Sequence, residues 1–148
     1  MVGEAVELEI PARAEFVALA RLAVSALAAA DGELADERVD DLKLAVSEAC
    51  TNAIEAHSAI ATDEPVVVRC WVDDNGLEVR ISDRGAGFDP SELPDHPPVT
   101  DPARLKFERG LGIPLIRALV DEVEFTSSGA GTEVRLVMHH GNGNQLKQ

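Results

Sequence analysis

Residues 47–57 read SEACTNAIEAH, and they lie within a longer segment, from about 35 to 59, that has a clear helical period. Glu48, Asn52 and Glu55 fall at i, i+4 and i+7, so they share one side of that helix, turned away from its apolar stripe. The apolar stripe, with side chains three and four positions apart, consists of Val39, Leu42, Val46, Ala49 and Ala53. The segment therefore predicts a long helix with one core-facing side and one oxygen-rich side.

On the N-terminal side of this helix, the residues predict a strand and another helix. Residues 5–10 (AVELEI) alternate between apolar and polar side chains, as in a half-buried strand that Pro11 ends. Strong helix formers then run from Pro11 to about Ala30, and Asp31-Gly32 supplies a stop.

After the long helix, the period changes from helical to alternating. The β-branched runs 65–72 and 77–82 flank DDNG (73–76), a tight-turn signal, and together they predict a hairpin. Residues 83–109 carry five prolines and no sustained period. This pattern predicts a long loop, and loops of this length commonly act as lids or binding loops.

The C-terminal part predicts a short helix over 110–119 and two strands, 122–126 and 132–138. The order β-α-α-β-β-loop-α-β-β favours the α+β class. We expect a two-layer α/β sandwich with a mixed, mostly antiparallel sheet and helices on one face. A single domain should span residues 1–140, with a flexible tail over 141–148.

The amino-acid composition argues against a nucleic-acid-binding protein and against a membrane-spanning one. The chain has 148 residues, enough for one domain, and its 13 Lys+Arg against 27 Asp+Glu give a net charge of −14. Such a surface repels nucleic acid and suits a basic protein partner. The longest apolar stretch, 16–30, is shorter than the roughly 20 residues that span a bilayer. No secretory signal is visible, so we expect a cytoplasmic protein.

The cysteines and histidines indicate no metal or disulfide framework. Cys50 and Cys70 form no CxxC motif, and we expect both to be small buried side chains. The four histidines lack the spacing of a zinc site, so we expect no dedicated zinc site.

The oxygen-rich side of the long helix suits a divalent cation. An Asn amide oxygen beside carboxylates, as at Glu48, Asn52 and Glu55, is the hard-oxygen chemistry that Mg²⁺ accepts, with waters and substrate phosphates as further ligands. The same spacing is also typical of a solvated helix face. The spacing alone leaves both interpretations open.

Two glycine-containing motifs suit a nucleotide. DRGAGF (83–88) follows a predicted strand; its Asp can accept a hydrogen bond from an exocyclic amine, and its glycines let backbone approach a ligand. RGLG (109–112) opens the predicted short helix, whose free N–H groups attract an anion. A Gly-rich turn explains the first motif equally well. Gly131-Thr132 stands at the start of the last predicted strand, where a plain hairpin loop is sufficient to explain it.

In combination and in order, SEACTNAIEAH (47–57), DRGAGF (83–88), ERGLG (108–112) and GTEV (131–134) resemble the four ATP-binding motifs of the GHKL ATPase superfamily. This resemblance covers nearly the whole chain and implies the Bergerat, or histidine-kinase-like ATPase, fold. The short leading strand and GIPLIRALVDEVEF (112–125) are most similar to the stand-alone anti-sigma-factor serine kinases of the RsbW type.

The resemblance implies a role for each matching residue. Glu48 would be the general base that prepares the attacking hydroxyl or water, and Asn52 would bind the Mg²⁺ held on the triphosphate. Asp83 would bind the adenine amino group of ATP, with Gly85 and Gly87 shaping the pocket.

The C-terminal motifs would complete the nucleotide site. Thr132 would act through a water, and the amides of Gly110, Leu111 and Gly112 would bind the phosphates, with Arg109 adding positive charge. The loop 89–109 would be the ATP lid.

The implied function is a partner switch. The kinase would hold an RNA polymerase sigma factor inactive and phosphorylate a serine on a STAS-type anti-sigma antagonist, with ATP and Mg²⁺ as cofactors. The unphosphorylated antagonist would displace the sigma factor. Dimerisation is usual in the family and implies a homodimer. The alternative is a nucleotide-gated regulator that binds ATP and a partner without transferring phosphate, and a third reading is an ATPase-like regulator of another partner.

The sequence departs from the family pattern at one helix turn. Family members usually place a His four residues after the Asn, whereas this chain has Ala56 there and His57 one position later. The proposed base and metal residues are unaffected by this shift.

Overall fold

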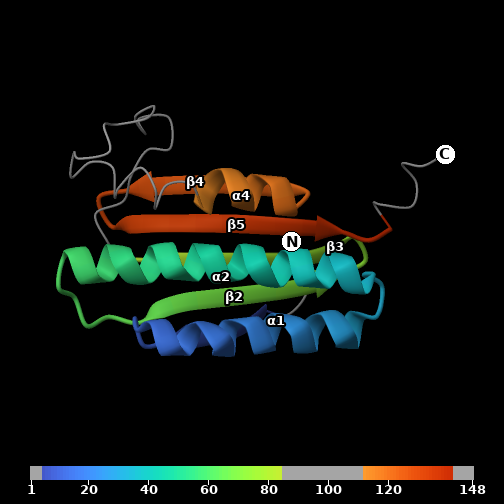
Figure 1. The fold of residues 1–148 in the computed structure, drawn as a ribbon, viewed down its shortest axis with the longest axis horizontal. Coiled ribbons are helices and arrows are strands. Elements are labelled where there is room, and N and C mark those ends of the chain that lie inside the picture. Colours follow the sequence, from blue (N-terminus) through green and yellow to red (C-terminus); the bar gives the residue numbers. More distant parts are fainter. Residues whose placement is uncertain (1–4, 85–111, 142–148) are drawn as a thin grey trace.

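A computed structural model describes residues 5–84 and 112–141 of the chain. Its five strands form one sheet in the order β1-β2-β3-β5-β4, with every pairing antiparallel. The helices lie on one face of that sheet (Figure 1). The elements are β1 (Ala5–Ile10), a 3₁₀ turn (Ala14–Phe16), α1 (Val17–Asp31), α2 (Asp36–Ala59), β2 (Val66–Asp73), β3 (Gly76–Asp83), α4 (Gly112–Leu119), β4 (Glu122–Ser128) and β5 (Gly131–His139). The predicted α+β sandwich with helices on one face is confirmed; within the described residues its sheet is antiparallel throughout and has no parallel pair, unlike the mixed sheet that the sequence predicted.

The first helix begins later than its sequence pattern predicts. Arg13 is extended, with φ −138° and ψ 141°, and the following residues make a 3₁₀ turn, so α1 begins at Val17. Its end agrees with the prediction: Gly32 adopts φ +73°, and its N–H donates to the carbonyl oxygen of Ala28 at 2.9 Å. This left-handed cap is a conformation that glycine adopts without strain.

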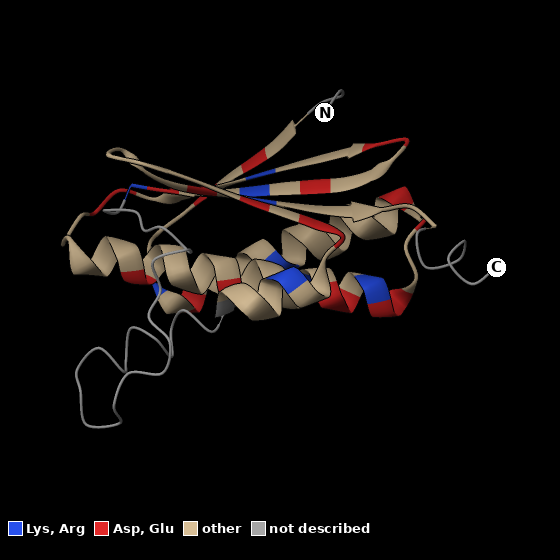
Figure 2. Ribbon diagram, turned by 90° about the horizontal axis from the view of Figure 1, so that it is seen from above, with Lys and Arg blue, Asp and Glu red and all other residues tan. Residues whose placement is uncertain are grey.

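The core lies between the helices and the facing side of the sheet, as Figure 2 shows edge-on. The large side chains that are at most 1% exposed there include Ile10, Val24, Leu42, Val46, Val66, Ile81, Ile116, Leu136 and Met138. Each such burial contributes roughly 1.5–3 kcal/mol. None of the helices in the described parts of the chain combines the length and apolar character that crossing a bilayer requires.

The two cysteines are part of this core, as the sequence indicates. Cys50 on α2 and Cys70 on β2 are both buried and free. Burial raises the pKa of the Cys50 thiol to about 12 and that of Cys70 to about 11. Both thiols therefore stay protonated and unreactive near neutral pH.

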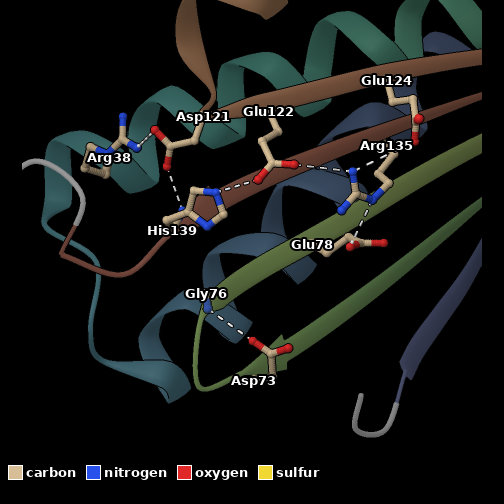
Figure 3. Close-up of polar contacts among 9 residues, drawn as sticks. All are labelled: Arg38, Asp73, Gly76, Glu78, Asp121, Glu122, Glu124, Arg135 and His139. Carbon is tan, nitrogen blue, oxygen red and sulfur yellow. Dashed lines mark hydrogen bonds and ion pairs between the residues drawn. The ribbon is translucent and has the colours of Figure 1, made fainter. Parts of the chain in front are cut away.

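The sheet face away from the helices carries an ion-pair network. Glu78 is only 2% exposed, and its carboxylate lies 2.5 Å from Nε of Arg80 and 3.1 Å from Nε of Arg135. Arg135 also reaches Glu122 and Glu124, at 3.6 and 3.9 Å, across to β4 (Figure 3). Paired arginines thus compensate the buried Glu78 charge.

At the end of the sheet where α2 begins, carboxylates tie the layers together. Asp121 accepts a hydrogen bond from Arg38 of α2 and another from the backbone N–H of His139, both at 2.6 Å (Figure 3). These bonds fix the α2 N-terminus to the last strand.

His140 links two further segments at the end of the sheet where α2 begins. Its Nε2 lies 2.7 Å from Oδ2 of Asp31, at the end of α1, and its Nδ1 lies 2.9 Å from the carbonyl oxygen of Asp74. Burial by itself lowers the pKa of His140. The hydrogen bonds to Asp74 and Asp31 and the charges of Asp31 and Glu33 outweigh it, so the net pKa is raised.

We expect His140→Gln to remove a stabilisation that is largest in mild acid. The folded-state pKa of His140 lies above its unfolded value, so the contribution is complete below the unfolded pKa and is lost as pH rises through the folded pKa. The free energy of unfolding should fall by more near pH 6 than near pH 9. Urea unfolding across this range measures the difference, and a deficit that grows with pH would contradict the assignment.

Candidate functional site

A cavity of about 150 Å³ lies between the second half of α2 and the adjoining strands β3, β5 and β4. Its lining residues are Ala49, Asn52, Ala53, Ala56, Ala59, Ile81, Asp83, Phe125, Thr132 and Val134. Asn52, Asp83 and Thr132 come from three of the motifs that the sequence singles out. The fold therefore brings together residues that are far apart along the chain.

The cavity is mostly apolar, with a few polar groups at its wall. Small side chains on α2, such as Ala49, Ala53 and Ala56, leave the space open, and Phe125 of β4 contributes an aromatic wall. The guanidinium of Arg117 lies 5.3 Å from the centre of the Phe125 ring. This composition is typical of a small-molecule site. Phe125 was not predicted as a site residue because an isolated aromatic residue on a strand belongs to no motif.

Asp83 is held at the cavity wall by the neighbouring strand. It is the last residue of β3 and lies opposite Thr132 in the register with β5. Its Oδ1 accepts a hydrogen bond from the Thr132 N–H at 3.3 Å. Thr132 is 4% exposed, and its hydroxyl lies 3.1 Å from that of Ser127. The orientation of the Asp83 carboxylate is thus coupled to the start of β5.

Gly131 makes this close pairing of β3 and β5 possible. A Cβ at this position would lie 1.9 Å from the carbonyl oxygen of Asp83, and the residue has φ +135°. An L side chain would collide with β3 and strain the backbone. The glycine of the GTEV motif therefore has a steric role at the site.

The oxygen-rich side of α2 is half-buried. Glu48, Asn52 and Glu55 all have intermediate exposure, and Asn52 lines the cavity. Glu48 lies one helical turn before Asn52, on the same side of the helix. Within residues 5–84 and 112–141, no three His, Cys, Asp or Glu side chains gather as a metal site. A Mg²⁺ ion bound through one Asn and nucleotide phosphates needs no such group.

The structural role of His57 was not predicted from the sequence. Its ring, 1% exposed at the end of α2, lies 2.9 Å from the carbonyl oxygen of Glu64 and 2.8 Å from the backbone N of Arg84. Arg84 directly follows Asp83. The shifted histidine therefore contacts the backbone beside the cavity.

The chain matches a known protein family over most of its length. Residues 10–138 match the histidine kinase-like ATPase domain. The chain belongs to this family. Among its relatives, the serine-protein kinase RsbW of Bacillus pumilus is 37% identical over 132 residues, which cover 86% of this chain and 81% of that protein. The serine-protein kinase RsbW of Bacillus subtilis is 38% identical over 122 residues, covering 80% and 75%.

Solved structures agree on the histidine kinase-like ATPase fold. A structure of the RsbU and RsbW domains of a Mycobacterium tuberculosis protein matches with a TM-score of 0.68 and 19% identity, covering 93% of this chain and 33% of that one. The histidine kinase domain of a blue-light-activated kinase from Erythrobacter litoralis matches with a TM-score of 0.56 and 24% identity, covering 93% and 64%. At 19% and 24% sequence identity, these structural similarities establish the fold alone.

The remaining site residues that the family resemblance implies lie at or beyond the edge of the described structure. Gly112 is the first residue of α4, whose Ile113 and Ile116 are buried. The others fall outside the described residues: Gly85, Gly87, Arg109, Gly110 and Leu111.

We expect Gly131→Ala to destabilise this ATPase domain far more than Gly129→Ala. A Cβ at 131 would meet the Asp83 carbonyl, whereas a Cβ at 129 would have nothing within 4 Å. The free energy of unfolding should fall by about 3 kcal/mol in the first variant and by less than about 0.5 kcal/mol in the second. Urea unfolding measures both, and equal losses would contradict the steric role of Gly131.

Proposed function

We propose that this chain is an ATP-dependent serine-protein kinase that acts as an anti-sigma factor. It sequesters an RNA polymerase sigma factor and phosphorylates a serine on a STAS-type antagonist. The observation that carries the proposal is the cavity lined jointly by Asn52, Asp83 and Thr132, in a chain about 37% identical to proteins named serine-protein kinase RsbW. The domain unit is residues 1–140, with 141–148 as a tail.

ATP occupies the cavity with its adenine ring against the apolar wall. Asp83 accepts a hydrogen bond from the adenine amino group, and Thr132 contacts the adenine end of ATP through a bridging water. Gly85 and Gly87 shape the adenine pocket. The amides of Gly110, Leu111 and Gly112, with the Arg109 side chain, bind the phosphates at the start of α4, where a helix dipole favours negative charge.

The second half of α2 supplies the groups for phosphoryl transfer. The Asn52 amide oxygen binds Mg²⁺, and that ion, when bound, neutralises charge on the phosphates. Glu48, one turn earlier, accepts the proton of the attacking serine hydroxyl. Phosphoryl transfer depends mainly on positioning and charge stabilisation, so a carboxylate, a metal and backbone amides suffice.

The alternative, a nucleotide-gated binding protein without phosphoryl transfer, is not favoured. A pure binder has no need of a general base, and the chain retains Glu48 in the position that the family motif gives it. The similar proteins are themselves named as kinases.

The acidic surface fits the proposed partners. With a net charge of −14, the chain attracts a basic protein surface such as that of a sigma factor and repels free nucleic acid. Because a sigma factor works with RNA polymerase, we place the chain in the cytoplasm, and we propose that it acts as a homodimer.

We expect Mg-ATP to raise the melting temperature of the natural protein and to have little effect on Asp83→Asn. The substitution replaces a carboxylate oxygen that accepts the adenine amino group by an amide that can present a donor. At about 100 times the Kd, binding adds roughly 2.7 kcal/mol, a shift of several degrees. Thermal unfolding with ATP, with and without Mg²⁺, measures this shift. An equal shift in Asp83→Asn would refute the adenine assignment.

We expect Glu48→Gln to abolish phosphoryl transfer while ATP binding is retained. Gln keeps the shape of Glu but cannot accept the serine proton, so the rate should fall by about 10²-fold or more. Transfer of labelled phosphate to a STAS-domain antagonist from the same organism gives the rate, and calorimetry gives the ATP affinity. Glu55→Gln, at the next half-buried Glu on α2, is the matched control. A Glu48→Gln protein that still phosphorylates the antagonist would exclude Glu48 as the base.

A further inference from the structure

The His57 ring is held in one orientation by hydrogen bonds to the two segments that it joins. Its Nδ1 faces the carbonyl oxygen of Glu64, at 2.9 Å, and its Nε2 faces the backbone N–H of Arg84, with 2.8 Å between the nitrogens. A carbonyl only accepts and a backbone N–H only donates, so Nδ1 carries the proton and Nε2 offers its lone pair. The ring is at the same time 1% exposed, out of reach of water.

The hydrogen bond from the Arg84 N–H to His57 takes the place of a sheet hydrogen bond beyond the end of β3. The β3–β5 pairing ends at Asp83 opposite Thr132, so Arg84 lies just beyond the ladder. His57 accepts the hydrogen bond of the Arg84 amide at that point. The backbone on the C-terminal side of Asp83 is therefore held by α2, while Oδ1 of Asp83 is held by β5.

The same helix also carries a cavity residue close to His57. Asn52 lies five positions earlier on α2, about 7.5 Å along the helix axis. A hydrogen bond from His57 to Arg84 thus fixes Asp83 relative to Asn52, on two facing walls of the cavity.

The ion pair beside His57 is a weaker link than the buried ring. Glu64 from the α2–β2 connection and Arg84 after β3 form an ion pair at 3.7 Å, but their side chains are 54% and 65% exposed. Exposed pairs contribute about 0–1 kcal/mol. Asp63 in the α2–β2 connection, Glu55 on α2 and Asp83 at the end of β3 are further carboxylates near these segments along the chain.

We propose that His57 is a positioning residue for the adenine end of the nucleotide site. Its ring holds the Asp83–Arg84 backbone in place by accepting the hydrogen bond of the Arg84 amide at Nε2. This inference rests on the proposed function, in which Asp83 binds the adenine amino group. Loss of this hydrogen bond therefore weakens nucleotide binding, although His57 does not line the cavity.

The test compares two nucleotides. Isothermal titration calorimetry with Mg-ATP and with purine riboside triphosphate, which lacks the amino group, is carried out on the natural protein, His57→Ala and His57→Gln. We expect His57→Ala to weaken ATP binding about tenfold and binding of the analogue less than about threefold. His57→Gln, whose amide oxygen can accept from Arg84, should recover most of the ATP affinity. Equal losses for ATP and the analogue in His57→Ala would overturn the proposal.

These outcomes are separable from failure of the proposed function. If the natural protein binds neither triphosphate, the nucleotide site itself is refuted and the His57 proposal falls with it. If the natural protein binds ATP in preference to the analogue and the His57 variants do the same with unchanged affinity, only the positioning role is refuted.

Discussion

The pairing of β3 with β5 is the constraint on which the site depends. Each of these two strands begins with a glycine that admits a carbonyl oxygen of the other strand. A Cβ on Gly76 would lie 1.9 Å from the Met138 oxygen, and one on Gly131 would lie equally close to that of Asp83. Because side chains alternate along a strand, a slip of one residue would turn Asp83 away from the cavity. The two glycines hold both ends of the ladder in register.

The helix α2 serves the core and the site with different residues. Leu42, Val46 and Cys50 are fully buried against the sheet, while Asn52 and the alanines of the next turns border the cavity. The cavity therefore lies at the edge of the core, where small side chains replace large ones. A ligand there can contact apolar walls while its polar end reaches the half-buried face of α2.

The sequence predicted the elements well because their signals are local. Alternation identified the strands, a helical period identified α2, and the capping glycine after α1 identified its end. The insertion of β5 between β3 and β4 depends on long-range pairing, which no local pattern records. The grouping of Asn52, Asp83 and Thr132 was expected only from the family resemblance. The contact from His57 to Arg84 was missed because spacing along α2 does not reveal which backbone N–H lies opposite a ring.

The strongly negative charge of the chain and the binding of a polyanionic nucleotide are physically compatible. Acidic residues gather where α2 begins, at Asp36, Glu37, Asp40 and Asp41 (Figure 2). Asp41 lies 11 residues before Asn52, so about 16 Å of helix separates even the last residue of this acidic cluster from Asn52. That distance is about twice the Debye length at physiological ionic strength, so salt screens most of the repulsion. Within the cavity wall, Asp83 contributes the single carboxylate among the described lining residues, and it faces an uncharged adenine in the proposed complex. The acidic end is therefore free to attract a basic partner without weakening the nucleotide site.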